Sequence, residues 1–248
     1  MNFSFYQHHG YLILENLVSA SEIYSLKEKA QNLLQSSIHS ENQTLNNTEY
    51  FLKSSSNISV FRDSFQNIDK IGHALHIHNP TFKQFTHKPI FRDICQNLAI
   101  LNPLITQSMY LLKHPNSSKV DPHQDSTFIH TTPLSCIAFW IPLDEVTVDN
   151  GCLWVIPGSH TSDLKTRFKY KDSKLVFDPP TKEDYQDEWL PLPMKPGSVL
   201  IMHGSLIHKS EKSVSTMNRR EVYSFHVVSK DSEWSEDNWI QKNVLMDL

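Results

Sequence analysis

The stretch Asp149-Asn150-Gly151-Cys152-Leu153-Trp154-Val155-Ile156-Pro157-Gly158-Ser159-His160 shows the pattern that decides the fold. Turn-forming residues at 149–151 and 157–159 enclose the apolar run Leu153–Ile156. Gly, Pro, Asn and Asp interrupt regular structure, and an apolar run this short suits a buried strand better than a helix. The stretch therefore predicts a short strand between two turns.

The same pattern continues on both sides of this stretch, from about residue 101 onward. Many short strands that follow a helical region predict a mainly β fold, a sandwich or barrel with helices packed outside. We expect one domain over residues 1–248, with a helical part at about 1–100 and a β core at about 101–230. The predicted strands are Ser108–Leu112, Phe128–Ile129, Ser135–Ile141, Leu153–Ile156, Val199–His203, Leu206–His208 and Glu221–Val228.

The N-terminal part has helical signals. A short helix, a turn at Gly10 and the strand Tyr11–Leu17 are expected within residues 3–17. The pair Ser19 and Glu22 has the spacing of a capping box, and apolar residues at helical spacing follow it. We expect a loop at 36–58, a helix and turn at Asp69–His87, and a surface excursion at 160–195.

Composition excludes several classes of protein. The chain is 39% hydrophobic and 20% charged, with a net charge of −4, which is ordinary for a globular protein. This balance gives no electrostatic footprint for nucleic acid or for an anionic membrane. No apolar run approaches the roughly 18 residues of a membrane span.

The cellular compartment is expected to be the cytoplasm, with the nucleus as an alternative, rather than the secretory route. Met1-Asn2-Phe3-Ser4 lacks the pattern of a signal peptide, and Met246-Asp247-Leu248 matches no peroxisomal signal. Three widely spaced cysteines form no disulfide or zinc pattern, which favours a reducing compartment. These cysteines are Cys95, Cys136 and Cys152.

A candidate metal site lies at Pro122-His123-Gln124-Asp125. On a strand, His123 and Asp125 share a face, and His208 from a distant strand would complete a set of two histidines and a carboxylate. Such a set without thiolates suits Fe(II), with manganese and zinc as alternatives. The triplet alone is weak evidence, because the chain has 14 His and 27 Asp and Glu and contains a second triplet at His39-Ser40-Glu41.

Arg220 is a candidate for binding an organic anion. Three protein ligands leave about three positions on an octahedral metal, and a 2-oxo acid with dioxygen can fill them. The far carboxylate of 2-oxoglutarate then needs a cation, and a guanidinium binds it with two parallel hydrogen bonds. We expect the strand that Arg220 opens to lie beside the strand of His208, with only one of Arg219 and Arg220 facing inward. The alternative is that the arginine pair guards a sheet edge.

Other residues have competing interpretations. Ser210, two residues after His208, can share its face on a strand. Trp140 lies in an apolar run and is more often core than cofactor wall. If 73–78 is helical, His73 and His76 share a face while His78 lies off it, which favours the wall of a polar pocket.

Four ordered blocks resemble the phytanoyl-CoA dioxygenase family. They are His123-Gln124-Asp125-Ser126, the stretch 149–160, the block His203-Gly204 through Ile207-His208-Lys209-Ser210, and Arg220 followed by Tyr223-Ser224-Phe225-His226. The segments Lys70-Ile71-Gly72-His73-Ala74-Leu75-His76 and Gln107-Ser108-Met109-Tyr110 resemble the subgroup called phytanoyl-CoA dioxygenase domain-containing proteins. The resemblance covers nearly the whole chain and is weakest at 36–58 and 160–195.

The resemblance implies a double-stranded β-helix, or jelly-roll, fold of the cupin type and an Fe(II)- and 2-oxoglutarate-dependent dioxygenase. It implies that His123, Asp125 and His208 bind iron and that Arg220, rather than Arg219, binds 2-oxoglutarate. It also implies that Lys70, Met109, Trp140 and Ser210 line the 2-oxoglutarate pocket.

The function expected on this basis is conversion of 2-oxoglutarate and O2 to succinate and CO2, with hydroxylation of an unidentified, small-molecule substrate. One alternative is a sensor module that binds 2-oxoglutarate and metal without turnover. Another is a cupin-like protein that uses zinc or manganese, which would give Arg220 no purpose.

Overall fold

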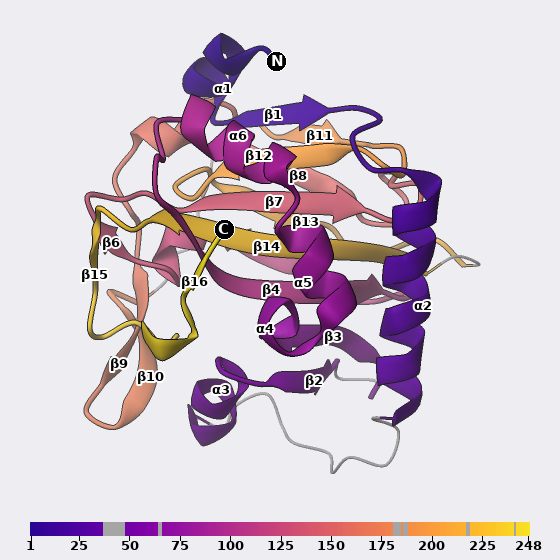
Figure 1. Ribbon diagram of the computed structural model, residues 1–248, viewed down its shortest axis with the longest axis horizontal. Helices are drawn as coiled ribbons and strands as arrows, with labels where there is room; N and C mark the ends of the chain where they lie inside the picture. The colour runs from indigo at the N-terminus through magenta and orange to yellow at the C-terminus, as the bar shows by residue number, and fades with distance from the viewer. Residues whose placement is uncertain (37–47, 64–65, 181–184, 186–187, 217–218, 241) are drawn as a thin grey trace.

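The computed structural model describes residues 1–36, 48–63, 66–180, 185, 188–216, 219–240 and 242–248. Within these residues, an eight-stranded antiparallel sheet forms the framework (Figure 1). Its strands, in spatial order, are β1 (Tyr11–Leu14), β12 (Val199–His203), β7 (Ile137–Pro142), β14 (Arg220–Ser229), β4 (Pro103–Lys113), β3 (Ile68–His73) and β2 (Ile58–Arg62), while β16 (Met246–Asp247) also pairs with β4.

A smaller antiparallel sheet packs against the large one through a second apolar cluster. In the described part of the chain it has four strands: β11 (Leu190–Leu192), β8 (Leu153–Val155), β13 (His208–Ser210) and β5 (Val120–His123). Two further pairs are the hairpin β9 (Arg167–Lys171) with β10 (Lys174–Asp178), and β6 (Thr131–Thr132) with β15 (Glu233–Trp234). Two facing antiparallel sheets agree with the predicted jelly-roll.

Strand β7 shows why the large sheet has two covered faces. Ile137, Phe139 and Ile141 contact the cluster that includes the helices, whereas Ala138 and Trp140 contact the cluster between the sheets. Successive side chains on a strand point to opposite faces, so a strand that is apolar throughout must be covered on both sides. Burial of each large apolar side chain contributes about 1.5–3 kcal/mol.

The helices cover one face of the large sheet (Figure 1). They are α1 (Phe3–His9), α2 (Ala20–Ser36), α4 (Leu75–His78), α5 (Pro80–Thr86) and α6 (Pro89–Asn97), while α3 (Thr48–Ser54) lies near the hairpin. Helix α2 begins with the predicted capping box, because the Ser19 amide donates to Glu22 at 2.9 Å and the Glu22 amide to the Ser19 hydroxyl at 3.3 Å.

Several predicted elements are confirmed, among them the strands at 153–155 and 199–203 and the turn at Gly10. Two are wrong. Phe128 follows the 3-10 helix η1 (Asp125–Thr127) and lies in no strand. Residues 68–73 form strand β3 rather than a helix, because they pair with β2 and β4. The predicted excursion at 160–195 lies mostly on the surface, as expected, but its described residues also form η2 (Ser159–Thr161), β9, β10 and β11.

The predicted loop at 36–58 is wrong where it can be compared, because α3 occupies 48–54; residues 37–47 lie outside the described residues. The N-terminal part also supplies β1, β2 and β3, which form both edges of the large sheet. The last short helix is η3 (Lys242–Val244).

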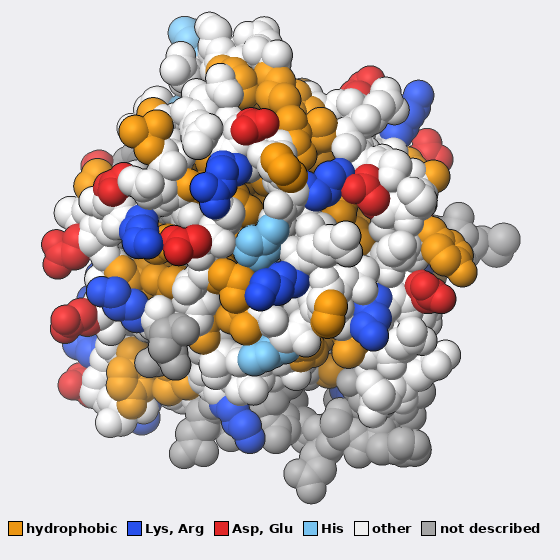
Figure 2. Space-filling model, viewed as in Figure 1, with side chains coloured by type: hydrophobic (Ala, Val, Ile, Leu, Met, Phe, Trp, Pro, Cys, Tyr) orange, Lys and Arg blue, Asp and Glu red, His pale blue; other side chains and the backbone are white. Residues whose placement is uncertain are grey.

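The surface has mixed charge on the face that carries the helices. Figure 2 shows Lys and Arg interspersed with Asp and Glu, without a continuous area of either sign. Within the described residues, we find no helix with the length and apolar character that a membrane span requires.

Candidate metal centre and its cavity

A cavity of about 660 Å³ opens between the two sheets. Its floor is the inward face of the large sheet, where β4 and β14 pair directly: Lys113 with Arg220, Met109 with Ser224, and Gln107 with His226. On the same face, Lys70 of β3 pairs with Leu111 of β4, and Trp140 of β7 pairs with Ser224. The opposite wall includes His123 and His208 of the small sheet.

His123, Asp125 and His208 meet on one side of this cavity. His123 ends β5 and His208 begins β13, and the two lie opposite each other in the ladder. Asp125 Oδ1 lies 3.9 Å from His123 Nε2 and 3.7 Å from His208 Nε2, and one possible ligand atom from each residue lies within 4.8 Å of the other two. The expectation that His123 and Asp125 share a strand is wrong: β5 ends at His123, and η1 turns the Asp125 carboxylate back toward it.

Both histidine rings are oriented by backbone carbonyls. His123 Nδ1 lies 2.8 Å from the carbonyl oxygen of Asp121, and His208 Nδ1 lies 3.0 Å from that of Leu206. A carbonyl only accepts, so each Nδ1 carries the hydrogen and each Nε2 presents a lone pair to the cavity. Burial, followed by the neighbouring His208, lowers the pKa of His123 to about 4, which keeps this imidazole neutral at pH 7.

The Asp125 carboxylate is approached from its other side by His226. His226 Nε2 lies 3.3 Å from Asp125 Oδ2, and His226 Nδ1 lies 3.2 Å from the side-chain nitrogen of Gln107. An amide nitrogen donates, so Gln107 requires a bare Nδ1 and leaves the hydrogen on Nε2, facing Asp125. Burial opposes ionisation of Asp125, but His226 and His208 outweigh it and hold its pKa well below the ordinary value.

The other end of the cavity contains two buried cations. Arg220 donates to the carbonyl of Gly151 at 2.8 Å, and its guanidinium carbon lies 5.1 Å from the Trp140 ring centroid. Lys113 Nζ donates to Ser210 Oγ at 2.7 Å, and Ser210 donates to Gly151 at 3.1 Å. Arg220 Nε is buried with no hydrogen-bond partner, and neither cation has a carboxylate within 4.0 Å among the described residues.

Burial sets the pKa values of these two cations. Burial lowers the pKa of Arg220 to about 10, so the guanidinium stays charged at pH 7. Burial, and next the charge of Arg220, lower the pKa of Lys113 to about 7. Gly151 has φ +82°, and a Cβ there would lie 2.5 Å from Lys113 Cε, so a glycine is needed beside these cations.

The structure brings the residues that the sequence singled out into one cavity. Its lining includes His123, Asp125, His208, Arg220, Lys70, Met109, Trp140 and Ser210. Arg219 points to the other face, where it pairs with Glu221. The expectation that the strand of Arg220 lies beside that of His208 is wrong: β14 belongs to the large sheet and β13 to the small one, and both line the cavity.

The histidine-rich segment 73–78 is divided between two faces. His73 ends β3 and lines the cavity. His76 lies on the helix side, where its Nδ1 contacts Ser108 Oγ at 2.8 Å, and His78 contacts the carbonyl of Ser56. The expectation that this segment is one helix with His73 and His76 on a common pocket wall is therefore wrong.

Sequence reasoning missed Lys113, and it noted Gln107, Gly151 and His226 only as parts of family blocks, without a role at the site. A signal existed for two of them, since Gln107, Met109, Leu111 and Lys113 alternate along one strand and so share a face. His226 lies an even number of residues after Arg220 on β14, which also places them on one face.

The comparisons with known proteins agree with this geometry. A family model described as phytanoyl-CoA dioxygenase (PhyH) matches residues 6–221. The chain belongs to the phytanoyl-CoA dioxygenase family. A relative from Arabidopsis thaliana named phytanoyl-CoA dioxygenase is 38% identical, covering 96% of this chain and 92% of its own. Phytanoyl-CoA dioxygenase domain-containing protein 1 of Danio rerio is 36% identical, covering 94% and 91%. The predicted family resemblance is confirmed.

Solved structures share the fold of this phytanoyl-CoA dioxygenase family member. EctD from S. alaskensis, with 2-oxoglutarate and 5-hydroxyectoine, has a TM-score of 0.71 at 20% identity, covering 94% of this chain and 76% of its own. The epimerase SnoN, in complex with Fe3+, alpha ketoglutarate and nogalamycin RO, has a TM-score of 0.69 at 18% identity, covering 93% and 83%. At these identities the likeness confirms the predicted double-stranded β-helix.

Proposed function

We propose that this protein is an Fe(II)- and 2-oxoglutarate-dependent dioxygenase that hydroxylates a small molecule. One observation carries the proposal. A single cavity has a set of two imidazoles and a carboxylate on one wall and, at its inner end, two buried cations without a carboxylate partner among the described residues. Membership of a dioxygenase family supports the oxidoreductase class.

The residues fit a divalent metal. His123, Asp125 and His208 supply two imidazoles and one carboxylate and no thiolate, which is the ligand set of non-heme Fe(II) oxygenases. This set leaves coordination positions open on the cavity side. The two Nδ1 hydrogens are already used on backbone carbonyls, so both Nε2 lone pairs are available.

The residues also fit 2-oxoglutarate. Arg220 has five N–H donors; one donates to Gly151, and the buried Nε–H has no partner. A buried charge with an unpaired donor is costly unless an anion binds to it, which favours a carboxylate ligand here. Lys113 lies at the same end, where one of its three N–H donors is used on Ser210 and the others remain for an anion. We place Lys70, Met109 and Trp140 along the 2-oxoglutarate site, because all three line the cavity floor.

When bound, iron and 2-oxoglutarate supply the oxidising chemistry, in which one C–H of the substrate becomes C–OH while 2-oxoglutarate and O2 give succinate and CO2. The chain's own residues bind and orient. His123, Asp125 and His208 would hold the metal, and Arg220 would hold the far carboxylate. The reaction requires no general base from the protein.

The test is an anaerobic titration of the metal-free protein with Fe(II) and then 2-oxoglutarate, followed by visible absorption. We expect a charge-transfer band that needs both additions and is lost in His123→Ala. Arg220→Met should raise the 2-oxoglutarate concentration needed by about 100-fold, because a charged hydrogen-bonded pair contributes about 1.5–3 kcal/mol.

The matched control is Arg219→Met, which removes the adjacent guanidinium from the other face. An unchanged 2-oxoglutarate requirement in Arg220→Met would contradict the assignment of Arg220. Succinate formation after admission of O2 would separate an enzyme from a sensor that binds without turnover. Tight zinc or manganese binding with no band would favour the cupin-like alternative.

A further inference from the structure

Five aromatic side chains line the part of the cavity next to the metal centre. We name this part the aromatic chamber and define it by Phe51, Phe128, Phe168, Phe177 and Trp239. These residues come from separate parts of the chain: α3, the residue after η1, the two strands of the β9–β10 hairpin, and the segment that follows β15.

The aromatic chamber is continuous with the metal centre. The His123 ring lies 5.8 Å from Phe128, edge to face, and Phe128 lies 5.5 Å from Phe168 and 6.0 Å from Phe177. Phe51 then lies 6.3 Å from Phe168 and 6.1 Å from Trp239. The chamber therefore offers aromatic contacts to a molecule whose reacting carbon lies at the metal centre.

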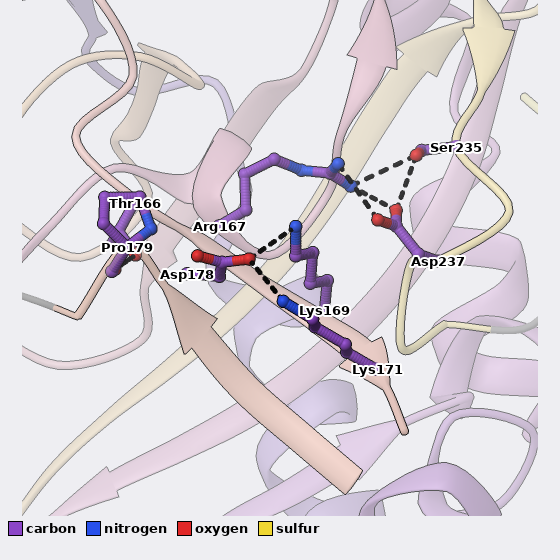
Figure 3. A network of polar contacts seen from close by, with 8 residues as sticks. All are labelled: Thr166, Arg167, Lys169, Lys171, Asp178, Pro179, Ser235 and Asp237. Carbon is purple, nitrogen blue, oxygen red and sulfur yellow. Dashed lines mark hydrogen bonds and ion pairs between the residues drawn. The ribbon is translucent and has the colours of Figure 1, made fainter. Parts of the chain in front are cut away.

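The hairpin wall of the chamber is fixed to the body of the protein (Figure 3). Arg167 forms an ion pair with Asp237 and donates to Ser235 at 3.1 Å. The Tyr170 amide donates to the Asp237 carbonyl at 2.8 Å, and the Leu175 amide to Thr48 Oγ1 at 3.4 Å. The chamber is thus a formed pocket before any ligand binds.

Two lysines of the hairpin beside the chamber are paired with a carboxylate. Lys169 and Lys171 both pair with Asp178, at 2.9 and 3.4 Å, and Figure 3 shows all three on the hairpin. At the rim, Lys119 pairs with Asp121 at 2.7 Å. A coenzyme A group carries several phosphate charges and needs a cluster of uncommitted cations, which these paired residues do not provide.

We propose that the aromatic chamber takes an uncharged, largely apolar ring molecule and that β9–β10 sets this specificity. The inference rests on the proposed function, because it names the substrate class of the same site. Flat rings gain both burial and edge or offset contacts against aromatic walls. The reaction is RH with 2-oxoglutarate and O2 giving ROH, succinate and CO2, so one C–H bond breaks and one C–O bond forms.

The test uses N-phenyl-1-naphthylamine, an uncharged fluorescent ring molecule, titrated into the full-length protein with and without Fe(II) and 2-oxoglutarate under nitrogen. We expect saturable binding of one probe per chain. Phe177→Gln should weaken it about ten-fold, since the lost ring contacts and burial amount to one or two kcal/mol. Phe177 is 40% exposed, so the variant buries no new polar group.

The matched control is Tyr170→Gln on the same hairpin, which is 42% exposed and outside the cavity lining, and should bind the probe as the wild type does. Naphthalene should displace the probe, whereas octanoyl-CoA at the same concentration should not. Displacement by octanoyl-CoA, or equal probe affinity in Phe177→Gln and Tyr170→Gln, would overturn the inference.

The charge-transfer titration of the same variants separates the two proposals. Phe177→Gln should keep the wild-type requirement for 2-oxoglutarate, because Phe177 is remote in the chain and structure from the Arg220 end of the cavity. Probe binding that depends on Phe177, in a protein that gives no charge-transfer band, would overturn the dioxygenase and support the chamber. The reverse result would overturn the chamber alone.

Discussion

At the scale of single residues, the metal affinity should depend on His226, which touches no metal in the proposed site. Its Nε2–H faces Asp125 Oδ2, and Gln107 fixes that tautomer. We expect His226→Leu to weaken Fe(II) or Co(II) binding by about 10- to 100-fold, as loss of an outer-shell partner typically does. Equilibrium dialysis under nitrogen measures this directly.

His226→Gln is the informative companion, because its side-chain amide can still donate toward Asp125. It should recover part of the lost metal affinity. If the Leu and Gln variants bind metal equally well, His226 only fills space and does not position the carboxylate.

Lys113 should lower the free energy of unfolding of the ligand-free protein, while it helps to bind an anionic ligand. Its pKa in the folded state is about 7, against 10.5 ordinarily. Below about pH 7 the folded protein must bury a charged ammonium, which water solvates once the chain unfolds. Between about pH 7 and pH 10.5, Lys113 is neutral in the folded protein and protonated in the unfolded chain, so the free energy of unfolding rises with pH. We expect Lys113→Met to raise the free energy of unfolding at pH 6 by on the order of 1–3 kcal/mol.

Urea unfolding of metal-free Lys113→Met at pH 6 and pH 9 checks this, and the gain should be smaller at pH 9. The same variant should bind 2-oxoglutarate more weakly, because one of the two cations at the Arg220 end of the cavity is gone. A Met variant less stable than wild type at pH 6 would show that Lys113 stabilises the fold.

At the scale of elements, Arg167 should be the main side-chain tether of the β9–β10 hairpin, beside the backbone bond from Tyr170 to Asp237. Arg167→Met removes the ion pair with Asp237 and the bond to Ser235. Both partners are partly exposed, so we expect a loss of only about 1 kcal/mol, confined to the hairpin. Hydrogen exchange at the amides of 167–178 should become several-fold faster in Arg167→Met.

The control for this tether is Lys171→Met, whose side chain is 55% exposed and, among the described residues, has its one ion pair with Asp178 at 3.4 Å. Its exchange rates should match the wild type. Faster exchange throughout the large sheet in Arg167→Met would mean that the tether supports the whole fold instead of one hairpin.

The elements also show what the sequence could predict. Strands such as β7 and β12 were recognisable because their side chains are apolar on both faces. Strand β3 was not recognisable, because Lys70 and His73, which line the cavity, interrupt the apolar pattern that a buried strand usually shows. The site residues thus weaken the signal of the very strand that carries them. Asp125 was correctly grouped with His123 and His208 but was expected on a strand. A 3-10 helix of three residues such as η1 is too short to give a periodic pattern in the sequence.

At the scale of the whole molecule, the two sheets supply different halves of the site. The metal side includes His123 and His208 of the small sheet, while Arg220 and Lys113 lie on the large one. A ligand that spans them stabilises the folded state by about 2.7 kcal/mol at 100 times its Kd. For a chain of this size we expect Tm to rise by about 5–10 °C with Mn(II) and 2-oxoglutarate together.

Calorimetry of wild type and Asp125→Ala tests this coupling, with Mn(II) used to avoid oxidation. The variant should lose most of the rise. A full rise with 2-oxoglutarate alone would indicate that the anion does not depend on the metal side of the cavity.

The backbone orientation of both histidines has a consequence for how such a protein can diverge. Each ring takes its direction from the carbonyl two residues earlier on its own chain segment, and no side-chain substitution at Asp121 or Leu206 can remove that acceptor. The aromatic chamber, in contrast, is made of side chains alone. In the proposed enzyme, side-chain substitutions in the chamber would therefore change the substrate one ring at a time, while the orientation of both imidazoles would stay the same.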